Sequence, residues 1–171
     1  MMDYKKNNNR ESVLNQTMSS ELYVSVVNGS FCPEKSRLPV GVRVFNSHEL
    51  SAKNNICVEH QKIVANMLSR PNIFIEVSGI FEETAGPIYI NYLVLAEFNN
   101  KKLNVSFFIE KNTRISFVEK WCIADKLTGP LKIQLTSNWT VESGAELLFY
   151  GLSPQNLCKD SCIANNIFLK Q

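Results

Sequence analysis

The sequence predicts a mainly β protein built from two antiparallel sheets packed face to face, in a jelly-roll or Greek-key arrangement, with one or two short helices. Apolar residues recur at every second position in roughly eight short segments, and turn-forming residues separate these segments. Strands and helices do not alternate along the chain, and no internal repeat is visible. One-sided strands bury their apolar faces most simply in a two-sheet sandwich, and a closed β-barrel is the alternative.

The length of 171 residues suits one folded domain. We expect residues 1–20, which are polar and lack periodicity, to form a flexible arm, and residues 21–171 to form a single β-sandwich domain. Such an arm is either a disordered tail or a segment that becomes ordered on a neighbouring subunit.

Two strands and a helix are expected in the first part of this domain. Residues 22–27 alternate and end at the turn pair Asn28-Gly29, and residues 40–45 place three valines on one face. Prolines bracket the segment between them, so we expect 28–39 to be a loop. Residues 54–70 show apolar residues at helical spacing and end at an Arg-Pro pair, which predicts one long helix.

The centre of the chain predicts strands at 73–81, 88–98 and 103–109. The run 88–98 is apolar on both faces, with Tyr89, Leu93 and Leu95 on the second face, so it is either covered on two sides or contacts another chain. Only four polar residues separate it from the next run. We therefore expect an antiparallel hairpin, because so short a loop cannot make a parallel crossover.

The last third predicts strands at 115–123, 131–136 and 145–152. The pair Ser153-Pro154 suits a helix N-terminus, so residues 154–164 are expected to form a short helix before the apolar residues 167–169.

Composition and charge exclude several classes of function. The formal charge of +2 lacks the basic excess of nucleic-acid-binding proteins. No apolar run approaches the roughly 20 residues of a membrane helix, and no apolar signal-peptide core follows the first residues. We expect a cytoplasmic protein or part of an intracellularly assembled particle. No phosphate-binding Gly-x-x-x-x-Gly-Lys-Ser/Thr or Gly-x-Gly-x-x-Gly pattern occurs.

Two cysteine pairs are weak candidates for chemistry. Cys57 and His60 are three residues apart, and Cys158 and Cys162 are four apart, so together they could supply the four ligands of a structural zinc site. Cys57 beside His60 is also the only basis for a small Cys/His-dependent enzyme, but no oxyanion-hole or nucleophile-turn pattern accompanies it. Packing of reduced cysteines is the simpler interpretation, and no cofactor is expected.

Tryptophan and carboxylate positions complete the candidates. Trp121 alternates into an apolar face and is expected in the core, whereas Trp139 follows Asn138 in a turn-like setting and is a candidate exposed contact residue. The strand carboxylates are expected on a polar outer face rather than as a glycosidase pair; they are Glu76, Glu97, Glu110 and Glu119.

These observations predict a non-catalytic assembly protein that acts through protein–protein contacts or self-association, such as a subunit of a viral particle or of a bacterial multi-protein complex. The alternative is a module that binds carbohydrate or another small ligand through Trp139 and Asn138. A flat exposed apolar patch would favour assembly, and a concavity lined by aromatic and amide groups would favour ligand binding.

Overall fold

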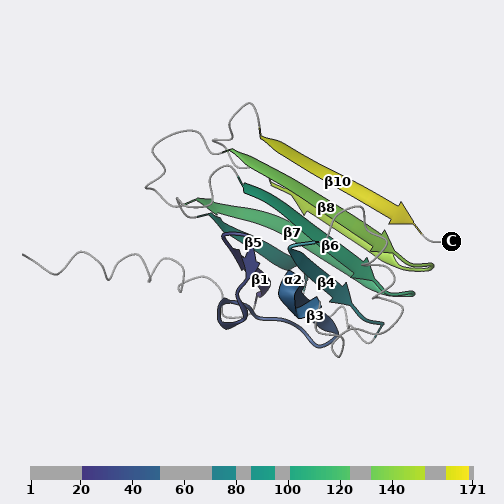
Figure 1. Ribbon diagram of the computed structural model, residues 1–171. Helices are drawn as coiled ribbons and strands as arrows, with labels where there is room; N and C mark the ends of the chain where they lie inside the picture. Colours follow the sequence, from purple (N-terminus) through teal and green to yellow (C-terminus); the bar gives the residue numbers. More distant parts are fainter. Residues whose placement is uncertain are drawn as a thin grey trace, which may run out of the picture.

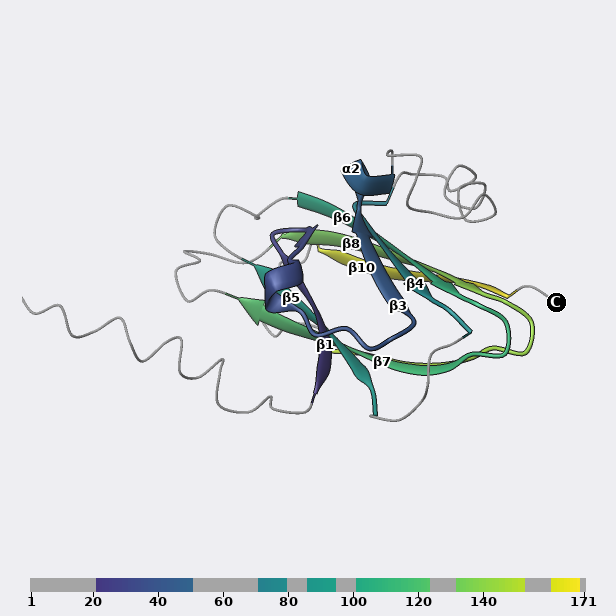
Figure 2. The ribbon, with the colours of Figure 1, turned by 90° about the horizontal axis from the view of Figure 1, so that it is seen from below.

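The computed structural model describes residues 21–50, 71–79, 86–94, 101–123, 132–152 and 161–169. Their strands form two five-stranded sheets, which lie as two layers in Figure 2. Sheet I contains, in spatial order, β2 (Ser30–Phe31), β1 (Leu22–Val27), β5 (Ile88–Val94), β7 (Arg114–Ile123) and β9 (Glu146–Gly151). Sheet II contains β10 (Cys162–Leu169), β8 (Ile133–Val141), β6 (Lys101–Ile109), β4 (Ile73–Val77) and β3 (Val42–Asn46) (Figure 1).

The two-layer, mainly β architecture is confirmed, but the antiparallel jelly-roll arrangement is wrong. Among the strands described, only β1 with β2 and β3 with β4 pair antiparallel, and every other neighbouring pair is parallel. From β4 onward, successive strands alternate between sheet II and sheet I. Strands that follow one another along the chain therefore belong to opposite layers rather than to one hairpin.

The expected hairpin between 88–98 and 103–109 is one of these errors. β5 lies in the middle of sheet I and β6 in the middle of sheet II, so the two strands share no ladder. A short loop forbids a parallel crossover only between neighbours in one sheet. It can still carry the chain from one sheet to the facing sheet, so loop length alone does not require a hairpin.

A structural repeat underlies the parallel pairing. In sheet II, Ile73 pairs with Val105, Val105 with Ser137 and Ser137 with Asn165, in steps of 32, 32 and 28 residues. In sheet I, residues 88, 117 and 149 are register partners, in steps of 29 and 32 residues. Each coil of the chain thus adds one strand to each sheet, although the sequence shows no repeated motif.

Two tight turns, at 110–113 and 142–145, carry the chain from sheet II to sheet I and stack on each other. The Asn112 N–H donates to the Ser143 carbonyl (3.3 Å), and the Glu146 N–H donates to the Thr113 carbonyl (2.8 Å). Gly144 has a φ of +72°, and a Cβ there would lie 2.4 Å from Asn112 Oδ1. Only glycine fits both the left-handed backbone and the close approach of the turns.

The core lies between the sheets and is filled by the inward-facing side chains of the strands of both sheets. Its centre is an aromatic cluster. The rings of Phe107 and Trp139, on neighbouring strands of sheet II, stack at 3.6 Å, while Phe117 and Phe149 reach Trp139 from sheet I at 5.7 and 4.8 Å. These contacts show that β8 faces β9 and hold the two layers together.

Most expected strands are confirmed, with changed ends. The strand 22–27 has the expected bounds, and β3 to β9 correspond to the runs predicted at 40–45, 73–81, 88–98, 103–109, 115–123, 131–136 and 145–152. The predicted loop 28–39 contains β2 and the 3-10 helix η1 (Pro33–Lys35), and one further helical turn, α2 (Ser47–Leu50), follows β3. The predicted helix 154–164 is wrong at 162–164, which begin β10.

The polar arm 1–20, the predicted helix 54–70 and residues 153–160 lie outside the described residues. In the part of the chain that the structure covers, no helix has the length and apolar character needed to cross a membrane.

Candidate functional site

Exposed apolar side chains gather at one end of the two sheets. Among the residues described, the exposed large hydrophobic side chains are Val40 and six others, all of them in or directly after the last two strands. We call these six the open edge: Leu148, Tyr150, Leu152, Ile167, Phe168 and Leu169. Single exposed apolar residues are ordinary, but six of them in or directly after the two strands that end the sheets on the same side indicate a contact surface.

In the described residues, the two sheets end at different positions on the side of the open edge. Strand β10 extends sheet II beyond β8, but sheet I ends at β9, which faces β8. Ile167 is the register partner of Trp139 and Leu169 that of Val141, so these pairs point to the same side of sheet II. Trp139 and Val141 are 0% and 4% exposed, whereas Ile167 and Leu169 are 56% and 74% exposed. The difference arises because, among the described strands, none of sheet I lies opposite β10.

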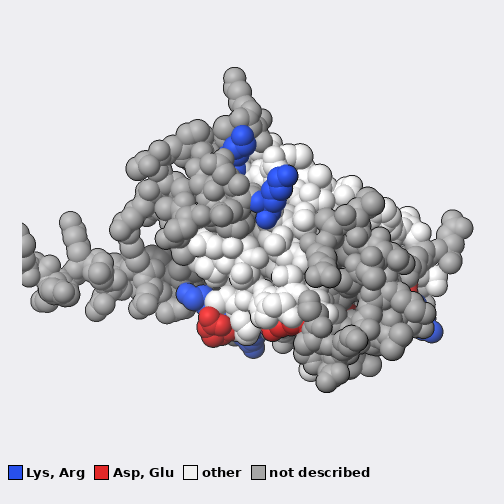
Figure 3. All heavy atoms as spheres, viewed as in Figure 1, with Lys and Arg blue, Asp and Glu red and all other residues white. Residues whose placement is uncertain are grey.

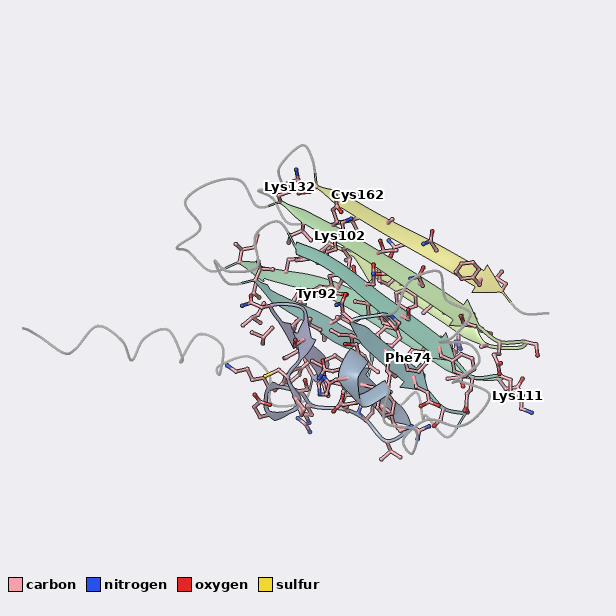
Figure 4. The ribbon with its side chains drawn as sticks, viewed as in Figure 1. Phe74, Tyr92, Lys102, Lys111, Lys132 and Cys162 are labelled. Carbon is pink, nitrogen blue, oxygen red and sulfur yellow. The ribbon has the colours of Figure 1, made fainter. Side chains whose placement is uncertain are left out.

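The free sides of β9 and β10 have no strand neighbour among the described residues. Proteins usually protect such edges with charged side chains or proline. The sequence of β10, CIANNIFL, contains neither, so the described atoms of this strand that are visible in Figure 3 are uncharged, although lysines lie beside its start (Figure 4). The one charged residue of β9, Glu146, is exposed and pairs with Arg114 at 2.9 Å.

The opposite end of the sheets is covered. Along the outer side of β1, Tyr23 exchanges backbone hydrogen bonds with Arg37 (2.9 and 2.8 Å), and the Cys32 N–H donates to the Ser25 carbonyl (2.9 Å). Asn46 of β3 then bridges the two sheets, since its Oδ1 accepts from the Phe31 N–H (2.7 Å) and its Nδ2 donates to the Phe31 carbonyl (3.3 Å).

Sheet II is protected differently at this covered end. Its edge strand β3 carries Arg43, whose Nη2 lies 2.7 Å from Oε2 of the buried Glu76. A charge on an edge strand opposes pairing with another chain. Phe31 and Leu38 pack against the core from the same end.

Glu119 is the most perturbed acid in the described structure. It projects from β7 into the core, where it is 2% exposed and accepts a hydrogen bond from the Tyr92 hydroxyl (3.0 Å). Burial raises the pKa of Glu119 from its ordinary 4.5 to about 7, and the Tyr92 hydrogen bond opposes part of that rise. Burial, together with the Glu119 carboxylate, also raises the pKa of Tyr92 well above 10.

The expectation that Glu119 lies on a polar outer face is therefore wrong. Its alternation phase matches that of Phe117 and Trp121, and its register partner in β9 is Gly151, which leaves space for the carboxylate. Tyr92 lies in the interior (Figure 4), and its ring stacks on Trp121 at 4.5 Å.

The residues predicted to contact a partner are placed as follows. Trp139 is fully buried, so the expectation of an exposed contact residue is wrong; it lies inside β8 rather than beside a turn. Asn138, on the outer face of β8, is half-buried and accepts a hydrogen bond from Asn166 Nδ2 (3.0 Å). Tyr89 and Leu93 are half-buried on the outer face of β5, and Leu95 lies outside the described residues.

The run 88–98, which is apolar on both faces, forms the central strand β5 of sheet I. β5 has β1 and β7 on its two sides, and Lys120 Nζ lies 3.6 Å from the centre of the Tyr89 ring. Among the described residues, the large apolar side chains of the open edge are more exposed than those on the outer face of β5.

The candidate zinc ligands Cys57, His60 and Cys158 lie outside the described residues. Cys162 is an exposed free thiol at the start of β10 (Figure 4). The part of the chain that is described contains no group of three or more His, Cys, Asp or Glu side chains placed to hold a metal ion.

Sequence reasoning missed the open edge. The signal was present in residues 162–169, where apolar residues stand without a single charge. It was overlooked because Ser153-Pro154 suggested a helix through residue 164, which left only three residues for a final strand.

Comparison of the chain with protein-family models, with curated proteins and with solved structures finds no match. The functional argument therefore depends on the geometry of the open edge alone.

Proposed function

We propose that this chain is a non-catalytic assembly protein that binds other protein chains through its open edge. The observation that supports the proposal is the concentration of exposed apolar side chains on two edge strands, of which β10 carries no charge and β9 only Glu146. Exposed apolar side chains of this kind favour assembly over the binding of a small polar ligand.

Sheet edges bind protein chains by a known physical route. An incoming strand satisfies the free backbone groups of the edge, and its side chains contact those of the edge strand on both faces. At the open edge, Ile167 and Leu169 offer apolar contacts on the inner face, and Phe168 offers them on the outer face. Both faces of an added strand would thus find apolar partners.

The carbohydrate-binding alternative depended on an exposed Trp139, and Trp139 is buried. Sugar recognition by stacking needs an exposed aromatic face, and Trp139 has none, because Phe107, Phe117 and Phe149 surround its ring. Asn138 has its side-chain oxygen engaged by Asn166. Nothing in the described residues favours this alternative over assembly.

Site-specific photocrosslinking tests the proposal. A benzophenone amino acid is placed at Leu169 in the open edge or at Val40 beside β3, and each full-length variant is produced in the cells from which the chain comes. Both positions are exposed, at 74% and 80%, so they form a matched pair. We expect crosslinks to protein from position 169 and few from position 40. Equal yields from the two positions, or no protein crosslinks at all, would contradict the proposal.

A further inference from the structure

We infer that the occupant of the open edge is a second copy of this chain, joined by a two-fold axis so that β10 of each copy becomes the missing facing strand of the other. The inference rests on the proposed function and names its partner. It follows from the unequal lengths of the two sheets at this end, from the absence of charge on β10 and from the covered state of the opposite end.

The geometry of a two-fold axis explains the fit. Sheet II extends one strand further than sheet I, because β10 lies beyond β8 while β9 faces β8 (Figure 1). A two-fold axis parallel to the strands exchanges the layers of the two copies. Strand β10 of the second copy then lies beside β9 and continues sheet I, and β9 of the second copy lies beside β10 and continues sheet II. Each layer becomes continuous, and no position is left empty.

The strand directions agree with this arrangement. β8 and β9 run in opposite directions, since the tight turn at 142–145 joins them and reverses the chain. β10 is parallel to β8. A rotation axis along the strands preserves their direction, so β9 and β10 of the second copy would pair antiparallel, which is the more stable ladder.

The side chains also complement one another. Rotation about an axis along the strands keeps each residue at the same height, so Ile167 would face Ile167 of the second copy across the layers, and Leu169 would face its own equivalent. Trp139 contacts Phe149 and is the register partner of Ile167, so Phe149 of one copy would lie beside Ile167 of the second copy. Because the two strands would run antiparallel, Leu148 would then lie beside Phe168 of the second copy on the outer face. The side chains exposed in one copy thus cover their counterparts in the other.

The absence of charge on β10 and the covered edge of β1 favour this two-fold pairing over a stack in which the open edge of one copy meets the β1 side of the next. Residues 162–169 carry no charge, so two identical edges meet without like-charge repulsion. An unlike-end stack would need a free edge on β1, but β2 and residues 32–37 already pair with that strand. A closed pair, rather than a filament, is the expected product.

The size of the contact sets the concentration range of the test. An eight-residue strand is about 26 Å long, and two layers about 10 Å apart with their outer side chains are about 20 Å thick. The contact is then on the order of 500 Å² per copy, or about 1,000 Å² in total, near the lower limit of specific interfaces. We therefore expect micromolar rather than nanomolar association.

Sedimentation velocity of the full chain tests the inference. It is run under reducing conditions, because the exposed Cys162 thiol could otherwise form disulfide-linked dimers. Wild type is compared with Ile167→Lys and with the matched control Val40→Lys, from roughly 1 to 200 µM, a range chosen for a contact of this size. Wild type and the control should form a dimer. Ile167→Lys should weaken it by at least about 100-fold, because two unpaired ammonium groups would be buried face to face.

A second variant keeps the test decisive. Leu169→Lys has an even more exposed starting residue, so it should fold if Ile167→Lys does not, and circular dichroism checks both. A wild-type monomer over the whole range, a dimer that survives both lysine substitutions, or open-ended larger species would each overturn the inference. A monomer that still crosslinks to a different protein from position 169 would overturn the second copy and leave the proposed function standing.

Discussion

The two ends of this molecule finish the same pair of sheets in opposite ways. At the β2–β3 end, residues 32–37 form backbone hydrogen bonds with β1, Asn46 bridges the sheets and Arg43 places a charge on the edge strand. At the β9–β10 end, sheet I stops one strand early and the last strand is apolar and uncharged. A coil of parallel strands creates free edges at both ends, and in the part of the chain that the structure describes further segments pair along only one of them.

The difference teaches where to look for function in such a fold. The interior strands of both ends follow the same alternation and bury the same kind of residue. What separates the ends is whether neighbouring chain covers the last strand. Phe31 and Leu38 pack against the core at the covered end, whereas the large apolar side chains of β10 at the open end are exposed.

The largest expected difference in the free energy of unfolding is between two register partners, Trp139 in β8 and Ile167 in β10. Trp139→Ala should lower the free energy of unfolding by about 3–5 kcal/mol, because it removes the centre of the aromatic cluster. Ile167→Ala, at the same register position in β10, should cost less than about 1 kcal/mol in the dilute monomer, because Ile167 is mostly exposed. Denaturant unfolding of both variants measures the contrast, and similar costs would contradict it.

The second effect concerns pH. Since the pKa of Glu119 in the folded chain is raised to about 7 from an ordinary 4.5, folding favours the protonated carboxyl. This stabilisation is fully present below about pH 4.5 and is lost as pH rises through about 7, so unfolding at pH 8 should require up to about 3 kcal/mol less than at pH 5.

A pair of glutamine variants isolates that effect. Glu119→Gln should remove most of the difference between pH 5 and pH 8, whereas Glu146→Gln, on an exposed carboxylate, should leave it in place. Denaturant titrations at the two pH values provide the measurement. A difference that persists unchanged in Glu119→Gln would show that other groups cause it.

A third effect tests the covered end. Asn46→Ala removes both hydrogen bonds to the Phe31 backbone and leaves that N–H and carbonyl without this partner, so it should cost about 1–3 kcal/mol. It should also raise the amide exchange rates of residues 30–31. A cost close to zero would mean that the bridge between the sheets does not hold the covered end.

The smallest effect is the matching change at the open end. Asn166→Ala removes only an exposed hydrogen bond to Asn138, so stability should change by less than about 0.5 kcal/mol. The same denaturant titration measures it. A loss as large as that of Asn46→Ala would mean that the open end is held by its own side chains in the way that the covered end is.

The strands themselves were predictable, because period-two patterns such as 22–27 and 103–109 report directly on alternate burial. Their pairing was not. The pattern of a strand in a parallel coil resembles that of a strand in a hairpin, and the 28–32-residue repeat is carried by backbone register rather than by repeated residues. Periodicity says which side chains face inward and says nothing about which sheet a strand joins.

The candidate site was less predictable than the fold. Asn138 and Ser137 suggest a turn, which predicts an exposed Trp139, but the alternation of Trp139 with Ile133 and Leu135 places it on the inner face. Conversely, the sequence pattern does not predict that Ile167 and Leu169 are exposed, because a buried strand has the same alternation of apolar residues. Their exposure depends on the absence, among the described strands, of a facing strand in sheet I, which is a property of the whole topology.

Amide hydrogen exchange of the full chain at low and high protein concentration, under reducing conditions, tests most directly the claim that one end is covered and the other open. β10 is paired with β8 and β9 with β7, so only the amides on the free sides of these two strands report on the contact. The account predicts that these free-side amides exchange rapidly in the dilute protein and become protected as concentration rises, while the amides of β1–β3 do not change. Protection of the free-side amides that is independent of concentration, or concentration-dependent protection at β1–β3, would contradict it.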